Sequence, residues 1–303
     1  MAARVVMTLL VRNEEDVIAD NIIFHHSQGI SHFVVMDNLS TDATPLILRR
    51  LAKFVPITLL WQSSDTYDQA LWVTEMARSA YRDHGADWVI NNDADEFWLF
   101  PGGDIPSFLD SIDPSVAGFY VKRFDAVLPK KCPARACLAH PSWSRFFWRE
   151  SVNALNRPLP HKCMHRSFAD VNVAQGNHDI SGHKGVILFN DQISILHFPY
   201  RRFSSYKSKI RLGGDAYRRN ALLPRSLGKA WRVQRKVLSS QGLGEFWRGL
   251  QVSPEGLSQG LSVGQIIEVN RLFRAVKYLR VKYRWFWIKC FFLRLICWNK
   301  RLI

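Results

Sequence analysis

The sequence predicts an α/β fold, with a mostly parallel sheet flanked by helices and a basic α-helical C-terminal region. Short apolar runs alternate with amphipathic segments over the first hundred residues. The composition, 47% apolar and 22% charged, is that of a chain that folds, which excludes disordered and fibrous classes. Basic residues gather in the last third of the 303 residues. Strands that alternate with helices are typical of a parallel sheet covered on both faces.

The first hundred residues supply four strands and three helices. Apolar runs rich in β-branched residues predict strands at residues 4–11, 32–36, 55–61 and 87–91. The segments between them predict helices at residues 13–28, 45–54 and 68–83. Asn13 is expected to cap the first helix, and Gly29 to end it. Pro45 lies in the first turn of the second helix, where proline is tolerated.

Beyond Pro101 the alternation loosens, and no internal repeat is visible. We expect a short helix at residues 106–111 and strands at residues 117–123, 186–189 and 193–198. After Tyr200 the segments are basic and helical, with a break in the Gly/Ser-rich stretch at residues 240–264. The expected organisation is therefore a catalytic domain at residues 1–200 and a basic helical region at residues 201–303.

The net charge of +15 is unevenly distributed. Residues 201–303 hold 23 Lys and Arg against four acidic residues, which leaves 18 basic and 22 acidic residues in 1–200. The five cysteines are an odd number with no CxxC pair, which fits neither a disulfide framework nor a zinc site. Neither a secretory signal nor an apolar run of membrane-spanning length is found. These observations predict a cytoplasmic protein.

Three acids, Asp93, Asp95 and Glu96, directly follow the strand at residues 87–91. In an extended chain alternate side chains share a face, so Asp93 and Asp95 are expected to project together. Their repulsion calls for a cation, and Mg²⁺ or Mn²⁺ bound by one or two carboxylates completes its shell with water and phosphate oxygens. The pattern predicts a nucleoside diphosphate site beyond the carboxyl end of a strand. The alternative is a solvated turn, which the apolar residues on either side disfavour.

A second polar turn follows the strand at residues 32–36. Asp37 at its end has two interpretations, an acceptor for a base or ribose and a residue of a turn. Ser40 or Asp42 is expected to cap the next helix.

Two segments, LLVRNEEDVIADNIIFHHSQGISHFVVMDNLSTDAT and DWVINNDADEFW, resemble glycosyltransferases with a GT-A (Rossmann-like) fold. The resemblance is to the family-2-like branch, whose members carry R-N-E, D-N-x-S-T-D and D-x-D-E-F motifs. It covers residues 4–100, and the later LHFPYRRFSSYKSKIRLGG resembles that branch's H-Y-P-x-[KR]-S-x-x-x-F-x-x-K segment. The resemblance implies a hexosyltransferase-type enzyme with a nucleotide-sugar donor, a divalent metal at Asp93 and Asp95, and inversion at the anomeric carbon.

The resemblance also assigns donor-binding residues and a third metal ligand. It implies that the donor is contacted by Arg12, Asn13, Glu14, Asp37 and Asp93. His197 corresponds to a C-terminal histidine that commonly ligates the metal in this branch. The alternative for His197 is a histidine satisfied within an apolar strand.

Inversion requires a general base within hydrogen-bond reach of the acceptor hydroxyl. Asp179, beside Gly176, is the first choice, and His178 and Glu150 are rivals. A polar surface turn is the competing description of this segment. Glu96 is expected to orient the metal-binding carboxylates, with a charge at the sheet edge as the alternative. Four basic residues could pair with pyrophosphate or remain solvated, namely Lys162, Arg201, Arg202 and Lys207.

The last 25 residues mix aromatic rings with cations, among them Trp285, Phe286, Trp287, Phe291, Phe292 and Trp298 with Lys282, Arg284, Lys289, Arg294, Lys300 and Arg301. Such a segment suits an anionic membrane surface, and lying on the bilayer is favoured over crossing it. The alternative is a C-terminal helix packed on the catalytic domain with its cations reaching solvent. The membrane interpretation predicts peripheral attachment at the inner face, with a glycan or lipid-linked acceptor of the cell envelope.

Three functional classes compete. A metal-dependent glycosyltransferase is favoured by the strand, turn and D-x-D combination. A nucleotidyltransferase would need a glycine-rich phosphate loop after the first strand, where this chain has Arg12 to Asp16 instead. A nucleic-acid-binding protein would use the basic region, but the acidic first part and the lack of a reader motif argue against nucleic acid as a partner.

Overall fold

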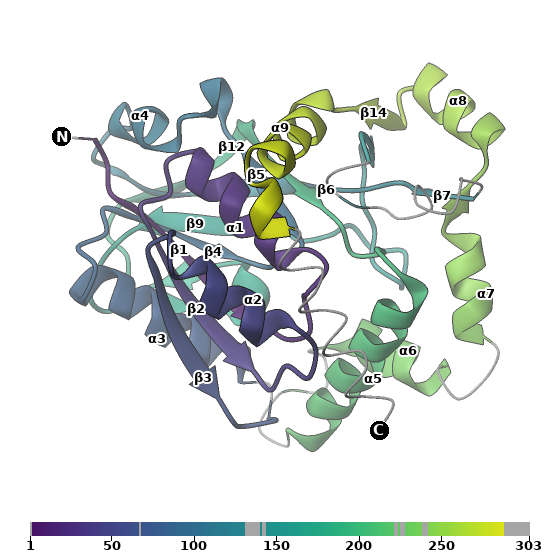
Figure 1. Ribbon diagram of the computed structural model, residues 1–303, viewed down its shortest axis with the longest axis horizontal. Helices are drawn as coiled ribbons and strands as arrows, with labels where there is room; N and C mark the ends of the chain where they lie inside the picture. The colour runs from purple at the N-terminus through teal and green to yellow at the C-terminus, as the bar shows by residue number, and fades with distance from the viewer. Residues whose placement is uncertain are drawn as a thin grey trace.

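The fold is described from a computed structural model, which covers residues 2–66, 68–130, 140, 144–220, 224, 228–237 and 242–287. Its centre is one eight-stranded sheet in the order β3-β2-β1-β4-β9-β6-β12-β5 (Figure 1). The first four strands in that order are parallel, whereas β9 and β5 run antiparallel to their neighbours. The strands are β1 Val5–Val11, β2 His32–Asn38, β3 Ile57–Gln62, β4 Trp88–Asn92, β5 Glu96–Leu99, β6 Val116–Asp125, β9 Lys162–Arg166 and β12 Val186–His197.

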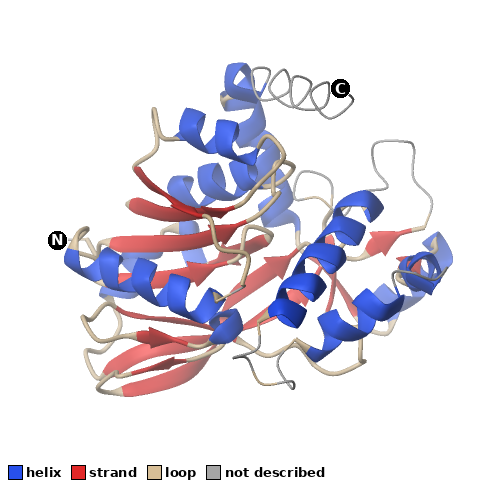
Figure 2. Ribbon diagram, turned by 90° about the horizontal axis from the view of Figure 1, so that it is seen from below, coloured by secondary structure: helices blue, strands red, loops and turns tan. Residues whose placement is uncertain are grey.

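Helices lie on both sides of this sheet (Figure 2). They are α1 Ile18–Ser27, α2 Thr44–Leu51, α3 Gln69–Arg82, α4 Ile105–Asp110, α5 Phe203–Arg219, α6 Lys229–Val237, α7 Gly242–Gly249, α8 Pro254–Ser262 and α9 Asn270–Lys282, with short 3₁₀ turns η1 Pro101–Gly103 and η2 Gln175–Asn177. The remaining strands form three small pairings, from β7 Leu128–Pro129, β8 Phe146–Trp148, β10 Asn172–Val173, β11 Ile180–Ser181, β13 Gln251–Val252 and β14 Ile266–Glu268. The predicted fold class is confirmed.

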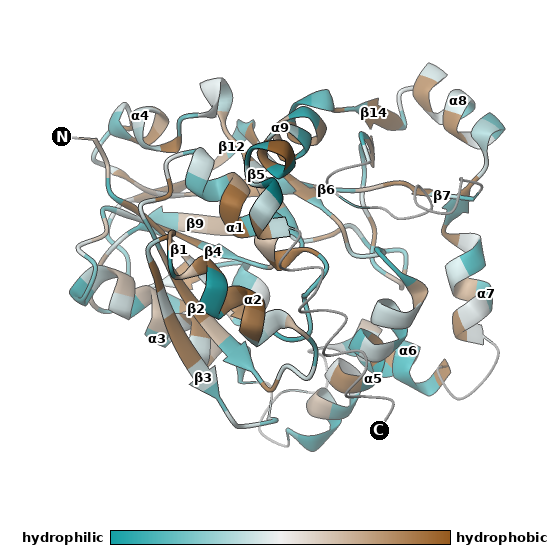
Figure 3. Cartoon of the chain, in the orientation of Figure 1, coloured by the Kyte–Doolittle hydropathy of each residue, from teal (hydrophilic) through white to brown (hydrophobic). Residues whose placement is uncertain are grey.

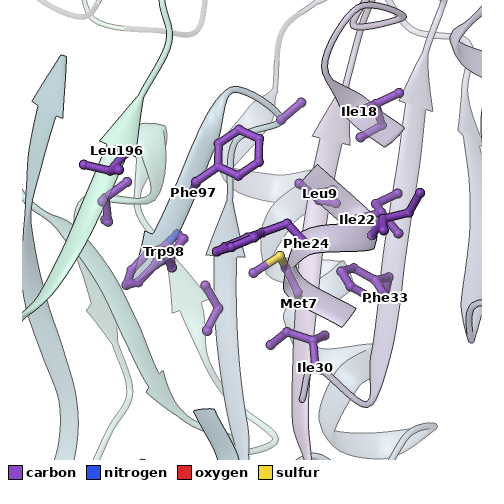
Figure 4. Close-up of a cluster of buried hydrophobic side chains, with 14 of the residues drawn as sticks. Met7, Leu9, Ile18, Ile22, Phe24, Ile30, Phe33, Phe97, Trp98 and Leu196 are labelled. Carbon is purple, nitrogen blue, oxygen red and sulfur yellow. The ribbon is translucent and has the colours of Figure 1, made fainter. Parts of the chain in front are cut away.

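Side-chain alternation along β1 builds two cores, one on each face of the sheet. Met7 and Leu9 point to the face covered by α1, α2 and α9, where Phe24, Phe97 and Trp98 join them (Figure 4). Val6 points to the opposite face, which α3 covers. Both faces are thus buried, which explains the continuous apolar runs of the first strands, brown in Figure 3.

The basic C-terminal region is helical, as predicted, and its last described helix returns to the sheet. Leu272, Val276 and Leu279 of α9 belong to the same core as β1 and α1. Arg280 of α9 also donates from Nε to Asp20 of α1 at 2.8 Å. The expected boundary near residue 200 stays a prediction, but this helix completes the core of the first region.

Three local predictions were wrong. Asn13 does not cap the first helix, because its backbone is left-handed (φ 59°) and the helix begins five residues later, at Ile18. The strands predicted at 186–189 and 193–198 are one strand, β12, with an irregular register at Asn190–Ile195. The stretch at residues 240–264 is not a break, since α7 and α8 lie in it, and Ser253 caps α8 by accepting from the Gly256 N–H at 3.1 Å.

Candidate active site

The turn between β4 and β5 carries Asp93 and Asp95. The Glu96 N–H donates to the Asp93 carbonyl at 3.0 Å, so these residues form a tight turn. The premise of an extended chain was therefore wrong at this point, and alternation does not fix where the two carboxylates point. The turn is only partly solvated, because Asp95 is 2% exposed whereas the Asp93 side chain is 33% exposed. Buried polar groups around the turn hold its backbone in place.

Helix α1 fixes the turn through a buried polar network. Asn21 donates to the carbonyls of Ala94 (2.9 Å) and Glu96 (2.8 Å). His25 accepts from the Trp98 N–H at 3.0 Å, and burial lowers the pKa of this histidine to about 3. A neutral imidazole is what that hydrogen bond requires, because one ring nitrogen must accept. The side chains that face the turn from α1 thus position both aspartates.

Asp95 faces a set of cations contributed by the chain after β12. Lys209 of α5 donates to Asp95 Oδ2 at 2.8 Å, and Arg201 donates to the same oxygen at 3.2 Å. His197 at the end of β12 places Nε2 3.7 Å from Asp95 Oδ1. Burial alone would raise the pKa of Asp95, but Lys209, His197 and Arg201 together lower it. Asp95 is therefore a buried carboxylate at physiological pH.

Arg201 joins the loop after β1 to the same cluster. Its guanidinium contacts Glu14 and lies 3.1 Å from Asp16 Oδ1. Burial would raise the pKa of Asp16, but Arg201 holds it below the usual value. For Glu14 burial prevails and raises the pKa to about 7, against the opposing charges of Arg201 and Lys209. One arginine thus compensates three carboxylates, including Asp95.

His197 is oriented by a carboxylate on its other side. Its Nδ1 lies 2.7 Å from Asp125 Oδ1 at the end of β6. Burial would lower the pKa of His197, but Asp125 and Asp95 raise it. When Nδ1 carries a proton and donates it to Asp125, the other ring nitrogen, Nε2, faces Asp95. Metal-binding histidines are commonly held by a carboxylate in this way.

Asp93 turns to different partners. Lys162 of β9 donates to Asp93 Oδ2 at 2.6 Å and to the Gly176 carbonyl at 2.9 Å. Asn177 donates to Asp93 Oδ1 at 3.3 Å. Burial would raise the pKa of Asp93, but Lys162 lowers it. The negative charge of Asp95 raises the pKa of Asp93, so the two carboxylates interact. Their hydrogen bonds nevertheless go to different lysines, Lys162 for Asp93 and Lys209 for Asp95.

Glu96 is the first residue of β5 and is fully buried. It accepts from Arg123 of β6 at 3.0 Å, and Lys162 is 3.4 Å from the same oxygen. Within the described residues its second oxygen has no hydrogen-bond partner. Glu96 and Asp93 thus contact the same lysine, Lys162. The expected role of Glu96, to orient the metal-binding carboxylates, stays a prediction.

The ends of β1 and β2 bring two further predicted residues together. Val11 pairs with Asp37 in the parallel register, so Arg12 follows immediately beside it. Asp37 uses Oδ1 to accept from the Ser40 N–H at 3.1 Å. In the part of the chain that is described, Asp37 Oδ2 and Arg12 Nε are buried without a hydrogen-bond partner. Burial raises the pKa of Asp37.

The loops after β1 and β2 are bonded to each other. Asn13 accepts from the Thr41 N–H at 2.7 Å, and its own N–H donates to Ser40 Oγ at 2.9 Å. The Glu14 N–H donates to Thr44 Oγ1 at 2.9 Å. Asp42 accepts from the Thr44 N–H at 2.9 Å, but the N-cap of α2 is Ala43, so the expectation that Ser40 or Asp42 caps this helix was wrong. The donor contacts expected from Asn13 and Glu14 stay predictions.

The three candidate bases have hydrogen-bond or ion-pair partners other than Asp93 and Asp95. Asp179 is exposed and accepts from the Tyr120 hydroxyl at 2.6 Å. His178 bonds the His161 carbonyl at 2.8 Å, and burial lowers its pKa to about 3. Glu150 pairs with Lys122 at 2.5 Å on the surface. The assignment of Asp179 as the base stays a prediction.

Of the four predicted cations, two enter the cluster. Lys162 and Arg201 are buried against carboxylates, whereas Arg202 and Lys207 are exposed. Sequence reasoning missed Lys209, Asp16 and Asp125. Lys209 had a signal, since it lies three residues after Tyr206 and one before Ile210, both buried on the inner face of α5.

Asp93, Asp95 and His197 are the predicted ligands of a divalent ion. Among the described residues, no group of three or more His, Cys, Asp or Glu side chains is arranged to hold a metal. Asp95 and His197 nevertheless face each other, and Mg²⁺ or Mn²⁺ in enzymes commonly takes few protein ligands and completes its shell with water and phosphate. Asp93, Asp95 and His197 as metal ligands stay predictions, since both aspartates are bonded to protein cations, Asp93 to Lys162 and Asp95 to Lys209 and Arg201.

The aromatic and basic tail is described only as far as Trp287, and its remaining residues, 288–303, lie outside the described part. Within the described ranges, none of the helices has the length and apolar character of a membrane span.

No protein-family model matches the sequence, and no curated protein is significantly similar to it. Solved structures with a similar fold exist. Residues 1–349 of Staphylococcus aureus TarS with UDP are 14% identical, cover 84% of this chain and 77% of that chain, and give a TM-score of 0.41. The mannosyltransferase PcManGT from Pyrobaculum calidifontis with GDP-Man and Mn²⁺ is 16% identical, with 100% and 88% covered and a TM-score of 0.41.

A third similar structure is glucosyl-3-phosphoglycerate synthase from Mycobacterium tuberculosis with Mn²⁺, UDP and glucosyl-3-phosphoglycerate. It is 19% identical, covers 41% of this chain and 44% of that chain, and gives a TM-score of 0.25. At these identities and TM-scores the likeness concerns the fold alone. Any function for this chain has to come from its own residues.

Proposed function

We propose that this protein is a metal-dependent glycosyltransferase that moves a sugar from a nucleotide donor to a glycan or lipid-linked acceptor. The observation that carries the proposal is the surroundings of Asp95, at the carboxyl end of β4. A buried carboxylate there faces His197, Arg201 and Lys209, which come from the chain more than 100 residues later. Ligands of open α/β sheets bind at this end of the strands.

The nucleoside is assigned to the ends of β1 and β2. Asp37 Oδ2 and Arg12 Nε are buried polar atoms without a partner in the described part of the chain. An unpaired buried acceptor or donor is unfavourable by about 1–3 kcal/mol, so a ligand that bonds both would recover that energy. Ribose hydroxyls and base N–H groups can donate to Asp37, and ligand oxygens can accept from Arg12.

The metal is assigned to Asp95 and His197. Asp125 supports this by holding His197 Nδ1, so that Nε2 is directed at Asp95. A bound Mn²⁺ or Mg²⁺ supplies a Lewis acid at the leaving diphosphate. Arg201 keeps Asp95 in place by bonding it together with Glu14 and Asp16.

Lys209 is assigned to the diphosphate. Its side chain is 38% exposed, whereas that of Arg201 is 5% exposed, so Lys209 is the cation of the cluster that solvent reaches. It can exchange Asp95 for a phosphate oxygen when a donor is bound. Its charge then opposes the negative charge that develops on the departing diphosphate.

The transfer itself is a substitution at the anomeric carbon. The acceptor oxygen bonds to that carbon as the bond to the diphosphate oxygen breaks, with inversion, and the acceptor's proton passes to a base. Asp179 remains the first candidate for that base.

The first test is donor binding. Thermal unfolding of the full-length protein is measured with UDP-, GDP- and ADP-sugars, each with and without Mn²⁺. At least one donor should raise the melting temperature in the presence of Mn²⁺ only, because a ligand that binds the folded state stabilises it. If none of them shifts the transition with either Mn²⁺ or Mg²⁺, the proposal fails.

The second test is a matched pair of lysines on α5. Lys209→Gln should lower kcat/KM for transfer by about 10²-fold, since it removes a charge that acts on the leaving group. Lys207→Gln is the control, because Lys207 is exposed two residues earlier on the same helix. If the two variants have equal activity, Lys209 is not the diphosphate cation.

A further inference from the structure

Helix α9 has apolar side chains on two faces. The inner face, with Leu272, Val276 and Leu279, is buried in the core. Tyr278, Val281 and Trp285, spaced three and four residues apart, are 64%, 68% and 66% exposed. That spacing places Tyr278 and Val281 on one side of α9, and Trp285 lies in the helical turn that follows the C-cap residue, Tyr283. We name these three residues the outer stripe.

Basic side chains flank the outer stripe. Lys277, Lys282 and Arg284 are exposed, and within the described residues no carboxylate lies within 4.0 Å of their charged nitrogens. The Arg284 guanidinium lies 5.5 Å from the Trp285 ring centre, and the Lys282 amine 5.6 Å from that of Tyr283. Glu268 is the last acid of the sequence, so the whole segment after it is positive.

An apolar hollow adjoins the outer stripe. Its volume is about 340 Å³, and its lining includes Phe54, Phe286, Trp285 and Lys282. Phe54 follows α2 and is itself 47% exposed. The exposed apolar surface thus continues from α9 to the end of α2.

We propose that the outer stripe and its flanking cations dock on an anionic lipid bilayer. Tyrosine and tryptophan rings lie at the level of the headgroups when a helix rests on a membrane, and lysine and arginine bind the acidic headgroups. A second copy of this chain would bring like charges together, so the charge of this face argues against self-association. The membrane surface matches both the apolar stripe and the positive charge.

Co-sedimentation of the full-length protein with vesicles tests the proposal. The vesicles are phosphatidylcholine alone, or phosphatidylcholine with about one third phosphatidylglycerol, at low ionic strength. The protein should bind the anionic vesicles and not the neutral ones. Equal partitioning into both kinds, or into neither, would overturn the proposal.

Two triple variants separate the stripe from its cations. Lys277→Gln with Lys282→Gln and Arg284→Gln should weaken partitioning on the order of 100-fold, since each basic residue contributes several-fold. Tyr278→Ser with Val281→Ser and Trp285→Ser should weaken it at least about tenfold. If either variant binds as the wild-type protein does, the docking face is not α9.

The matched controls carry the same changes elsewhere. Lys184→Gln with Arg218→Gln and Arg248→Gln removes three exposed cations from other elements. Val263→Ser removes an apolar side chain that is 60% exposed near the end of α8. Both should bind anionic vesicles as the wild-type protein does, and a loss equal to that of the α9 variants would overturn the proposal. Unchanged circular dichroism confirms that each variant is folded.

Discussion

Asp93 and Asp95 are separated by one residue, yet their surroundings differ. On the Asp95 side the partners are Arg201, Lys209 and His197, all from the chain at and after the end of β12. On the Asp93 side the partners are Lys162 and Asn177, and a nearby histidine, His178, has a lowered pKa.

The difference lies in how accessible the compensating charge is. Lys162 is 1% exposed and is held by Asp93, Glu96 and a carbonyl, so it has little freedom to reach a ligand. Lys209 is 38% exposed. We therefore expect substrate chemistry on the Asp95 side and a supporting role for the Asp93 side.

The largest expected effect is on stability. Arg201→Met leaves Glu14, Asp16 and Asp95 without their shared cation, and breaking a buried ion cluster in this way should reduce the free energy of unfolding by about 3–5 kcal/mol. Urea denaturation measures it. Arg202→Met, at the exposed neighbouring position, should change stability by less than about 0.5 kcal/mol. Equal losses would show that Arg201 is not the centre of the cluster.

The next effect separates the two aspartates by activity. Asp95→Asn should lower kcat/KM for transfer by about 10²–10³-fold, because it removes the proposed metal ligand and the partner of Lys209. Asp93→Asn should lower it only by about tenfold, because this side chain is bonded within the protein. Kinetics at saturating Mn²⁺ measure both. A larger loss for Asp93→Asn would reverse the assignment of the two sides.

The smallest effect concerns pH. Burial lowers the pKa of His178 in the folded protein to about 3, below the value near 6.5 of an unfolded chain. Below pH 6.5 the unfolded state therefore binds the proton first, and stability falls as pH falls. Between pH 7 and 5 the loss from His178 should be at most about 2 kcal/mol. His178→Asn should flatten this slope in urea titrations, and an unchanged slope would exclude His178 as a source.

The first sheet strands could be predicted because their signal is local. Apolar runs such as Val5–Val11 are buried on both faces, so each run marks a strand without knowledge of the rest of the fold. Strand β9 could not be predicted in the same way. It contains Lys162 and His165, which read as polar, and only the distant partners Asp93 and Asn91 allow them to be buried.

The site was predictable in its location but not in its pairing. Asp37, Asp93 and Asp95 follow strands, so they had to gather at one edge of the sheet. Which cation faces which carboxylate depends on the long return of the chain from Asp125 through His197 to Lys209. The spacing of residues in the sequence does not predict such contacts. The one local prediction, that Asp93 and Asp95 share a face of an extended chain, does not hold because residues 93–96 form a tight turn.

Helix α9 lies far along the chain from β1 but packs against α1, the first helix. Its buried residues Leu272, Val276 and Leu279 share a core with Met7 and Leu9. During synthesis the side of α1 that packs against α9 is therefore made long before the helix that covers it. We expect the growing chain to expose this surface on the ribosome, so chaperones have a long interval in which to bind it.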